Sequence, residues 1–508
     1  MTGFEFGGGG LGALGGLGRL EAYVRFDRPV SEDLFILIPG IMGSELYVDG
    51  KPVWSPRISA IFDGLTSLGD NLSRLEISGD SADDESLNDG VTVGGLIPDI
   101  HIIPGFKKID GYSGIGKRLV AEFRLRPGKN YFEFAYDWRR DNRATAKRLR
   151  KEASQWLKAW RETGPSGDKA RLILVGHSMG GLVARYFLEA LGGWEDARAF
   201  ITFGTPYRGS VKALDYVSNG YLKNHESLAK VTELVRSFTS TYQLMPIYDC
   251  CSPSPGEKPG ILTDAPSIPN VDKARLESAL TFHDELRKHA AANNDIEAYS
   301  TSRRYAFCPI IGIGQPTPSL AVVTPSGLET IALEDEGAGD GTVPRVSAEA
   351  PLPEPIWSGA CVHEFHGSLQ NNDAAWWQLK GVLERLYLTP DRKYIHLPEG
   401  VLKARMNATP LDPDVKLRLR DACAAEQDFQ CEVKRAGALK SIVEVGVESV
   451  ASGKTETRQV TLETADAWRP VNFGKLERGA YRCMARAGQQ IPGLIEKSGM
   501  VTDVFMVV

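Results

Sequence analysis

Apolar side chains change their spacing along the chain, and each spacing predicts a different element. Two short apolar runs, residues 34–38 and 171–175, are typical of buried strands. Residues 143–161 place apolar side chains at helical spacing among many basic ones, which predicts an amphipathic helix packed on a sheet with a basic outer face. Apolar positions at helical spacing begin again just after residue 178. We therefore expect a strand, a sharp turn and a helix around residues 171–191.

After about residue 397 the spacing becomes a two-residue alternation. Apolar Val415, Leu417 and Leu419 alternate with charged residues, and residues 443–448 and 481–486 follow a similar pattern. About seven short strands in roughly 110 residues predict a β-sandwich.

The type of this sandwich stays open. Gly479–Cys483 resembles the tyrosine corner of immunoglobulin-like domains, but no tryptophan follows Cys431 at the distance those domains use. We expect residues 397–508 to form a small all-β domain that binds a protein partner, another subunit or a lipid surface.

We refer to the residues before about 397 as the first region. Its candidate chemistry centres on the G-x-S-x-G pentapeptide at residues 176–180. A strand before it and a helix after it are the context of a nucleophile elbow, in which the serine occupies a sharp turn between glycines. The start of such a helix directs backbone N–H groups at the reacting oxygen. Ser178 is therefore the candidate nucleophile, and the N–H of Met179 is a candidate oxyanion-hole donor.

A serine needs a base, and the base needs a carboxylate to orient it. In α/β-hydrolases the three residues follow in the order Ser, Asp or Glu, His. Asp340 is the best acid candidate because the glycines beside it leave its carboxylate free to project. Glu334, Asp335 and Glu336 compete with it, although they are more typical of a solvated acidic loop.

Three of the eight histidines follow late enough to be the base: His363, His366 and His396. His366 lies just before an apolar segment with helical spacing, from which a base can reach over the sheet edge to the serine. We predict His366 as the base and His363 as a surface or supporting residue. His396 lies beyond that helix and is rejected.

A second oxyanion donor is expected upstream. The apolar run 34–38 opens into the glycine-containing turn at residues 39–44, where a backbone N–H can face the reaction centre. Ile41 is the predicted donor, through its backbone. A later strand end carries Asp137, Trp138 and Arg139, which are expected to shape the substrate cleft without being catalytic.

Short motifs follow one another in order between about residues 30 and 388: IPGIMGS at 38–44, IPGF at 103–106, YDWR at 136–139, GHSMG at 176–180, TFGTP at 202–206, YQLMP at 242–246, GDGTV at 339–343 and a histidine segment ending at 366. In this order they resemble the lecithin:cholesterol acyltransferase-like family of α/β-hydrolases, which includes lysosomal phospholipase A2 and phospholipid:diacylglycerol acyltransferase. The resemblance implies an α/β-hydrolase fold. It also implies Ser178, Asp340 and His366 as a triad, with the N–H groups of Ile41 and Met179 as the oxyanion hole. The family often has an acidic residue where this chain has Ile41.

Insertions over the catalytic face are expected for two reasons: the family implies a lid, and the segment at about residues 212–323 is long for a simple crossover. Secreted members staple a lid with a disulfide soon after the first turn, whereas this chain has no cysteine before Cys250. We expect a lid at about residues 47–112 and a cap at about residues 212–323. Within the lid, residues 80–89 are expected to form a solvated acidic loop. Three apolar residues of the lid fit a core strand and an apolar rim for acyl chains equally well: Leu96, Ile97 and Ile100.

Length and charge narrow the remaining choices. A chain of 508 residues is long enough for a hydrolase domain, predicted at 21–396, and the second domain at 397–508. A net charge of −6 argues against nucleic acid as the main partner.

Residues 1–20 are glycine-rich, resemble no signal peptide, and are expected to form a flexible tail. Seven cysteines without an export signal suggest free thiols, and we expect a cytoplasmic protein with peripheral membrane contact and no transmembrane segment.

The resemblance implies a serine acyl hydrolase or acyltransferase that acts on lipid esters, with phospholipid as the leading substrate and no metal or cofactor. A neutral-lipid or small-ester esterase is the enzymatic alternative. An alternative of another class is a gated membrane-targeting effector or lipid-binding protein. Its hydrolase domain would stay silent until the C-terminal domain meets a protein partner.

Overall fold

The computed structural model describes residues 31–55, 72–84, 86–98, 101–103, 107–220, 229–265, 267–297, 299, 305–325, 327–334, 338–350, 359–388, 415–435, 441–462, 467–488 and 500–507. The expected tail at 1–20 and the sequence candidates Ile100, Asp335, Glu336 and His396 lie outside these residues.

A six-stranded sheet forms the centre of the fold, in the order β14-β11-β9-β8-β1-β7. Every neighbouring pair in it is parallel. The two predicted apolar runs form β1 and β8, which are buried along their whole length. The strands are β1 (Leu34–Ile38), β7 (Tyr131–Glu133), β8 (Leu172–His177), β9 (Ala197–Phe203), β11 (Ala306–Ile313) and β14 (Ala360–His363).

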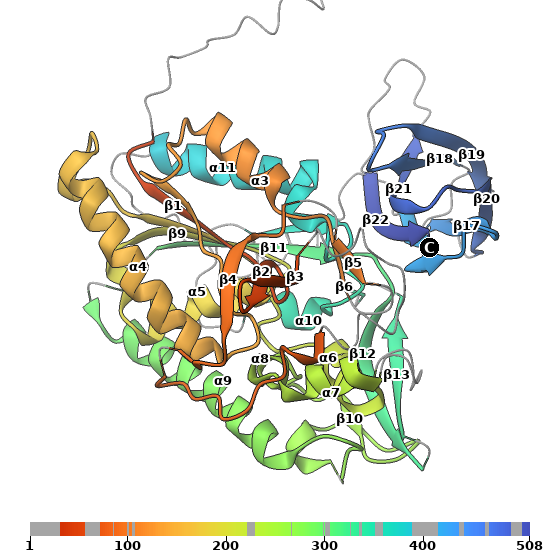
Figure 1. Cartoon of the computed structure of the whole chain (residues 1–508), viewed down its shortest axis with the longest axis horizontal. Helices are drawn as coiled ribbons and strands as arrows, with labels where there is room; N and C mark the ends of the chain where they lie inside the picture. The colour runs from red at the N-terminus through yellow and green to blue at the C-terminus, as the bar shows by residue number, and fades with distance from the viewer. Residues whose placement is uncertain are drawn as a thin grey trace, which may run out of the picture.

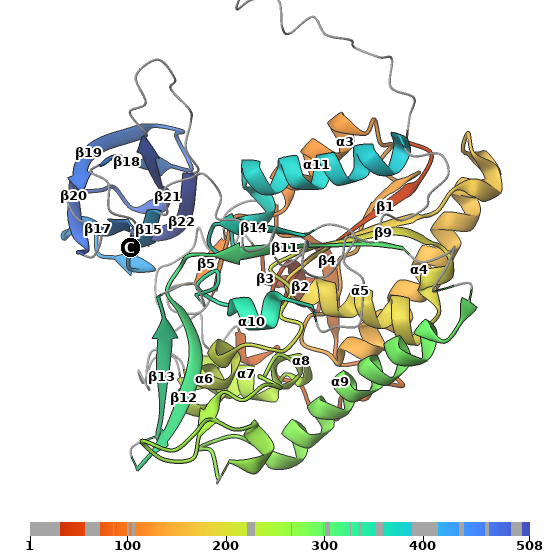
Figure 2. The ribbon, with the colours of Figure 1, turned by 180° about the vertical axis from the view of Figure 1, so that it is seen from behind.

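Helices cover both faces of this sheet (Figures 1 and 2). Helices α3 (Ser113–Glu122) and α11 (Asp373–Leu388) lie together over one face, and α4 (Asn142–Thr163) and α5 (Met179–Ala190) lie over the other. Helix α9 (Lys273–Asn294) packs outside α5. The predicted amphipathic helix is confirmed as α4, which buries Leu149, Ala153, Leu157 and Trp160. An α/β layer of this kind fixes the carboxyl ends of the strands at one edge, where sites form.

Smaller elements surround that edge. Strands β2 (Ser44–Val48), β3 (Lys51–Trp54) and β4 (Val91–Leu96) form an antiparallel sheet, and β5 (His101–Ile103) pairs with β6 (Lys107–Ile109). Leu96 and Ile97 are buried in the main core, so the rim interpretation of these two residues was wrong. Their place in the core follows from their packing beside the central sheet rather than from any feature of the local sequence.

The segment predicted as a cap divides into separate parts. It contains α6 (Val211–Asn219), α7 (Ala229–Ser237), α8 (Thr239–Gln243), α9 and β10 (Cys251–Ser252). However, β11 lies inside the predicted range 212–323 and yet belongs to the central sheet. After β11, strands β12 (Thr317–Thr324) and β13 (Gly327–Leu333) form a hairpin, followed by the short helix α10 (Arg345–Ala348).

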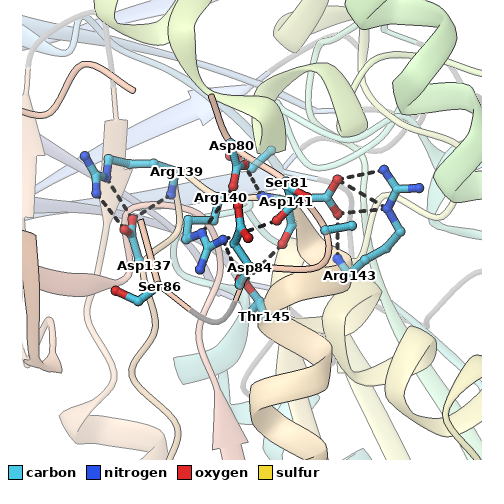
Figure 3. Close-up of polar contacts among 12 residues, drawn as sticks. Asp80, Ser81, Asp84, Ser86, Asp137, Arg139, Arg140, Asp141, Arg143 and Thr145 are labelled. Atoms are coloured by element: carbon cyan, nitrogen blue, oxygen red, sulfur yellow. Dashed lines mark hydrogen bonds and ion pairs between the residues drawn. The ribbon is translucent and has the colours of Figure 1, made fainter. Parts of the chain in front are cut away.

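The described residues of the acidic segment 80–89 are all exposed or half-buried, as expected of a solvated loop, but arginines between β7 and α4 also bind it (Figure 3). Arg140 donates to Asp80 and to the backbone carbonyl oxygen of Asp84, and the Asp80 side chain is almost fully buried. Arg139 donates to Asp89 and is itself completely buried. These contacts fasten the segment to the start of α4.

The C-terminal strands form two sheets, β15-β17-β20 and β16-β22-β21-β18-β19. We refer to both together as the C-terminal sheets. They bury the apolar positions of the predicted alternation in one shared core. Figure 1 shows them beside β5 and β6, and β22 contacts that hairpin. The strands are β15 (Val415–Arg418), β16 (Ala422–Cys423), β17 (Asp428–Arg435), β18 (Ser441–Ser449), β19 (Thr455–Leu462), β20 (Arg469–Lys475), β21 (Gly479–Gly488) and β22 (Met500–Val507).

Two further findings concern the cysteines and the helices. All seven cysteines are described, and none of them forms a disulfide bond. Across the residues that the structure describes, no helix combines the length and the apolar character needed to cross a membrane.

Candidate active site

Ser178 occupies a sharp turn between β8 and α5. Its backbone has φ 53° and ψ −127°, a conformation that residues other than glycine rarely adopt. The turn brings the start of α5 against residues 38–39, since a Cβ atom on Gly180 would lie 2.3 Å from the carbonyl oxygen of Pro39. Glycine at this position therefore allows the helix to approach the turn after β1. The backbone strain at Ser178 typically costs about 1–3 kcal/mol, and the packing of α5 against this turn offsets it.

Ser178, His366 and Asp340 form one hydrogen-bonded row. Nε2 of His366 lies 2.8 Å from Oγ of Ser178, and Nδ1 lies 2.8 Å from Oδ2 of Asp340. The backbone N–H of His366 also donates to the carbonyl oxygen of Asp340 at 2.8 Å. All three side chains are at least 95% buried within the protein. The imidazole thus stands between a hydroxyl and a carboxylate, the geometry of a nucleophile, a base and an orienting acid.

Asp340 is held in turn by its own loop. Its Oδ1 accepts hydrogen bonds from the N–H groups of Thr342 at 3.0 Å and Val343 at 2.7 Å, which leaves Oδ2 to His366. Gly204 lies against this pair with φ +54°, and a Cβ atom there would stand 2.8 Å from Oδ2 of Asp340 and 3.0 Å from Nδ1 of His366. Gly204 belongs to the TFGTP motif, whose residues alone do not indicate this role.

The turn at residues 39–44 is braced from several directions. Tyr136 donates its hydroxyl to the carbonyl oxygen of Pro39, and its own backbone N–H binds the side chain of Ser44. The indole N–H groups of Trp54 and Trp138 donate to the carbonyl oxygens of Met42 and Ser44. These bonds fix the backbone that the sequence predicts to carry an oxyanion donor.

A second row of hydrogen bonds joins this turn to the base through Tyr112 and His177. The N–H of Gly40 donates to Oη of Tyr112 at 2.8 Å, and Oη lies 2.8 Å from Nδ1 of His177. Nε2 of His177 lies 3.0 Å from the carbonyl oxygen of His366. Because a carbonyl only accepts, Nε2 carries the proton of His177, and Tyr112 donates to Nδ1. Burial raises the pKa of Tyr112, so its hydroxyl stays protonated and can donate this hydrogen bond.

The two predicted oxyanion donors belong to the two segments that pack together at Ser178. Ile41 belongs to the braced turn, and Met179 is the first residue of α5. Within the described part of the chain, neither backbone N–H donates to another protein group. Both are therefore available to a ligand, although their role stays a prediction.

A cleft of about 300 Å³ opens at Ser178. This volume is at the lower end of the range of roughly 300–1,000 Å³ for small-molecule pockets. Apolar residues of the first region line part of it, among them Ile41, Met42, Val235 and Leu244. The C-terminal sheets contribute another part of the wall, which no sequence pattern predicted.

The competing candidates lie elsewhere. His363 ends β14 and lines a separate cavity beside α3 and the C-terminal sheets. Glu334 is partly exposed and forms ion pairs with Arg418 and Lys434. Of the histidines and carboxylates that the structure describes, His366 and Asp340 are the ones hydrogen-bonded in the row with Ser178.

The expectation that Asp137, Trp138 and Arg139 shape the cleft was wrong. As far as the structure describes the cleft wall, it contains none of the three. Trp138 is buried against the turn at Ser44, and the guanidinium of Arg139 donates two hydrogen bonds to Asp137, at 2.9 and 2.7 Å. Trp138 thus supports the turn after β1 rather than lining the cleft.

A parallel sheet, a serine elbow after one of its strands, and an acid and a histidine placed later in the chain define an α/β-hydrolase. Residues 106–305 match the model of the family described as Lecithin:cholesterol acyltransferase. The resemblance drawn from the motifs is thereby confirmed over this segment, which contains Ser178 and ends before Asp340.

Curated relatives point to the same family. Human "Lysosomal phospholipase A and acyltransferase" is 29% identical over 225 residues, which cover 42% of this chain and 50% of the relative. Chicken (Gallus gallus) "Phosphatidylcholine-sterol acyltransferase" is 38% identical over 138 residues, covering 24% of this chain and 32% of the relative. The chain therefore spans half or less of the length of these two relatives.

Solved structures resemble the chain more distantly. The crystal structure of the Tle4-Tli4 complex has a TM-score of 0.45 and 16% sequence identity, and the match covers 70% of this chain and 99% of that one. A likeness of this size carries no weight for function.

Proposed function

We propose that the chain is a serine-dependent acyl hydrolase or acyltransferase acting on lipid esters, with phospholipid as its leading substrate. The observation that carries the proposal is the row in which His366 lies 2.8 Å from both Ser178 and Asp340. The family match and the two named relatives support lipid esters as the substrate class.

In the proposed reaction, Oγ of Ser178 attacks the ester carbonyl carbon while Nε2 of His366 takes the hydroxyl proton. Asp340 holds the imidazole and stabilises its charged form. The N–H groups of Ile41 and Met179 bind the oxyanion, and each such donor is typically worth about 3 kcal/mol. Collapse breaks the bond to the alcohol, which leaves with the proton from His366. Water or a second alcohol then takes the acyl group from Ser178 by the same steps in reverse.

The deciding experiment measures fatty-acid release from phosphatidylcholine vesicles by wild type and Ser178→Ala, with and without an added long-chain alcohol. A loss of activity on the order of a millionfold is expected in the variant. Free fatty acid identifies a phospholipase, and an alkyl ester of the added alcohol identifies an acyltransferase. Activity on p-nitrophenyl butyrate alone would instead favour a small-ester esterase.

A pair of histidine variants tests the base. His366→Asn is expected to lose activity almost as fully as Ser178→Ala, whereas His363→Asn is the matched control and keeps it. A fluorophosphonate probe should label wild type and not Ser178→Ala. If the folded wild type neither reacts with the probe nor releases fatty acid, the hydrolase proposal fails and the gated, silent alternative takes its place.

We also propose the domain division at 21–396 and 397–508, and an immunoglobulin-like type for the second domain. The hydroxyl of Tyr481 donates to the carbonyl oxygen of Glu477 at 2.8 Å, which supports a tyrosine corner. The expected lid at 47–112, the cytoplasmic location, the peripheral membrane contact and the protein partner remain predictions.

A further inference from the structure

Part of the cleft at Ser178 is built by residues that lie more than 230 positions later in the chain. Leu417 and Arg418 at the end of β15, then Leu419 and Asp421, and Asp503 of β22 contribute to its wall. A substrate bound at Ser178 therefore lies against both the first region and the C-terminal sheets.

These strands are fastened to the first region by polar contacts. The N–H of Thr502 in β22 donates to Oε1 of Glu364 at 2.7 Å. Arg482 pairs with Asp110 at 2.7 Å, and the Asp110 side chain is only 9% exposed. Nζ of Lys416 in β15 donates to the carbonyl oxygen of Glu334. Contacts of this number and burial hold the wall in a fixed position.

The contacts between the C-terminal sheets and the first region include the residue that precedes the base. Phe365 directly precedes His366, lines the cleft, and packs against the core of the C-terminal sheets. Leu419 also lines the cleft and is partly buried against that core. The two side chains extend the apolar lining provided by residues such as Val235 and Leu244.

We propose that Leu419 is a specificity-determining residue that contacts the acyl chain of the bound ester. The proposal rests on the proposed function, because it assumes that an ester carbonyl lies at Ser178. A cleft of about 300 Å³ holds one acyl group rather than a whole two-chain lipid. A side chain on its wall therefore sets how much of that chain is enclosed.

The test compares binding of p-nitrophenyl laurate and p-nitrophenyl butyrate, which differ only in the acyl chain. Ser178→Ala chains are used, so that binding is measured by calorimetry without turnover. Leu419→Trp narrows the cleft, which hinders the longer acyl chain more than the shorter one. The ratio of the laurate Kd to the butyrate Kd is therefore expected to rise at least tenfold. Leu419→Ala widens the cleft and should change the same ratio by less than Leu419→Trp does.

Leu476→Trp is the matched control. Leu476 is also partly buried against the core of the C-terminal sheets but is outside the cleft wall. A ratio that stays within twofold of the parent in Leu419→Trp, or that rises equally in Leu476→Trp, overturns the proposal. Failure of the proposed function shows separately, as a wild-type chain that turns over neither ester and does not react with a fluorophosphonate.

Discussion

Tyr112→Phe is the most informative substitution outside the triad, because it removes one oxygen atom that joins the oxyanion turn to the base. That oxygen accepts from Gly40 and donates to His177, both at 2.8 Å. The ring itself is 1% exposed and remains in the variant, so the packing is preserved. The substitution therefore isolates the two hydrogen bonds.

The magnitude follows from the groups left behind. The N–H of Gly40 and Nδ1 of His177 lose their partner in a buried site, and each orphaned group costs about 1–3 kcal/mol. The free energy of unfolding should fall by roughly 2–6 kcal/mol if neither group finds another partner. Because Gly40 directly precedes Ile41, the turn loses part of its fixed position. We expect kcat/KM to fall by about ten- to a hundredfold, or roughly 1.4–2.7 kcal/mol of transition-state stabilisation.

The assay measures initial rates on p-nitrophenyl butyrate across a substrate range. The loss is expected in kcat more than in KM, because oxyanion donors act mainly in the transition state. Tyr299→Phe is the control for simple destabilisation. It removes a buried hydroxyl that donates to Glu189 at 2.9 Å, at the end of α5 opposite Ser178. A folded Tyr112→Phe enzyme with wild-type kcat, or an equal loss in Tyr299→Phe, would refute the reasoning.

Two further predictions concern the surroundings of the triad. Gly204→Ala should lower kcat/KM by roughly a hundredfold, because its Cβ would stand 2.8 Å from Oδ2 of Asp340 and displace the base. Gly192→Ala has a similar φ of +75° with nothing within 4 Å, so it should share the backbone strain and keep the activity. Burial raises the pKa of Glu364 from 4.5 to about 8, so the folded state binds this proton more tightly than the unfolded state. Its stabilising contribution is complete below about pH 4.5 and is lost as the pH rises through about 8. The melting temperature of wild type relative to Glu364→Gln should fall across this window, and a difference independent of pH would contradict the assignment.

The sequence predicted best where its periodicity was strong and local. The apolar runs at 34–38 and 171–175 became β1 and β8, and the helical spacing at 143–161 became α4. The chain order of serine, acid and histidine led to the three residues that the fold brings within hydrogen-bonding distance. Each of these inferences depended on neighbouring residues or on a motif with a known local geometry.

The errors arose where distant segments decide burial. Arg139 is fully buried because Asp89 and the carbonyl oxygen of Leu75 lie beside it, and both come from a segment at least 50 residues earlier. The alternation around Leu419 predicted a strand but could not show that its end faces Ser178. His177 gave a similar problem, since the motif treats its position as variable although its side chain joins two loops.

His366 is held by two independent sets of contacts. From the first region, Asp340 binds its imidazole and its N–H, and His177 binds its carbonyl oxygen. From the C-terminal sheets, the contacts reach only the two residues before it, Glu364 through Thr502 and Phe365 through the shared core. Damage to the C-terminal contacts should therefore shift the base relative to Ser178 while leaving the elbow, which is packed against β1 and the turn after it, unchanged. Such a variant should acylate Ser178 slowly and, because the same contacts hold part of the cleft wall, should also bind long-chain esters more weakly, while the turn that carries the nucleophile stays formed.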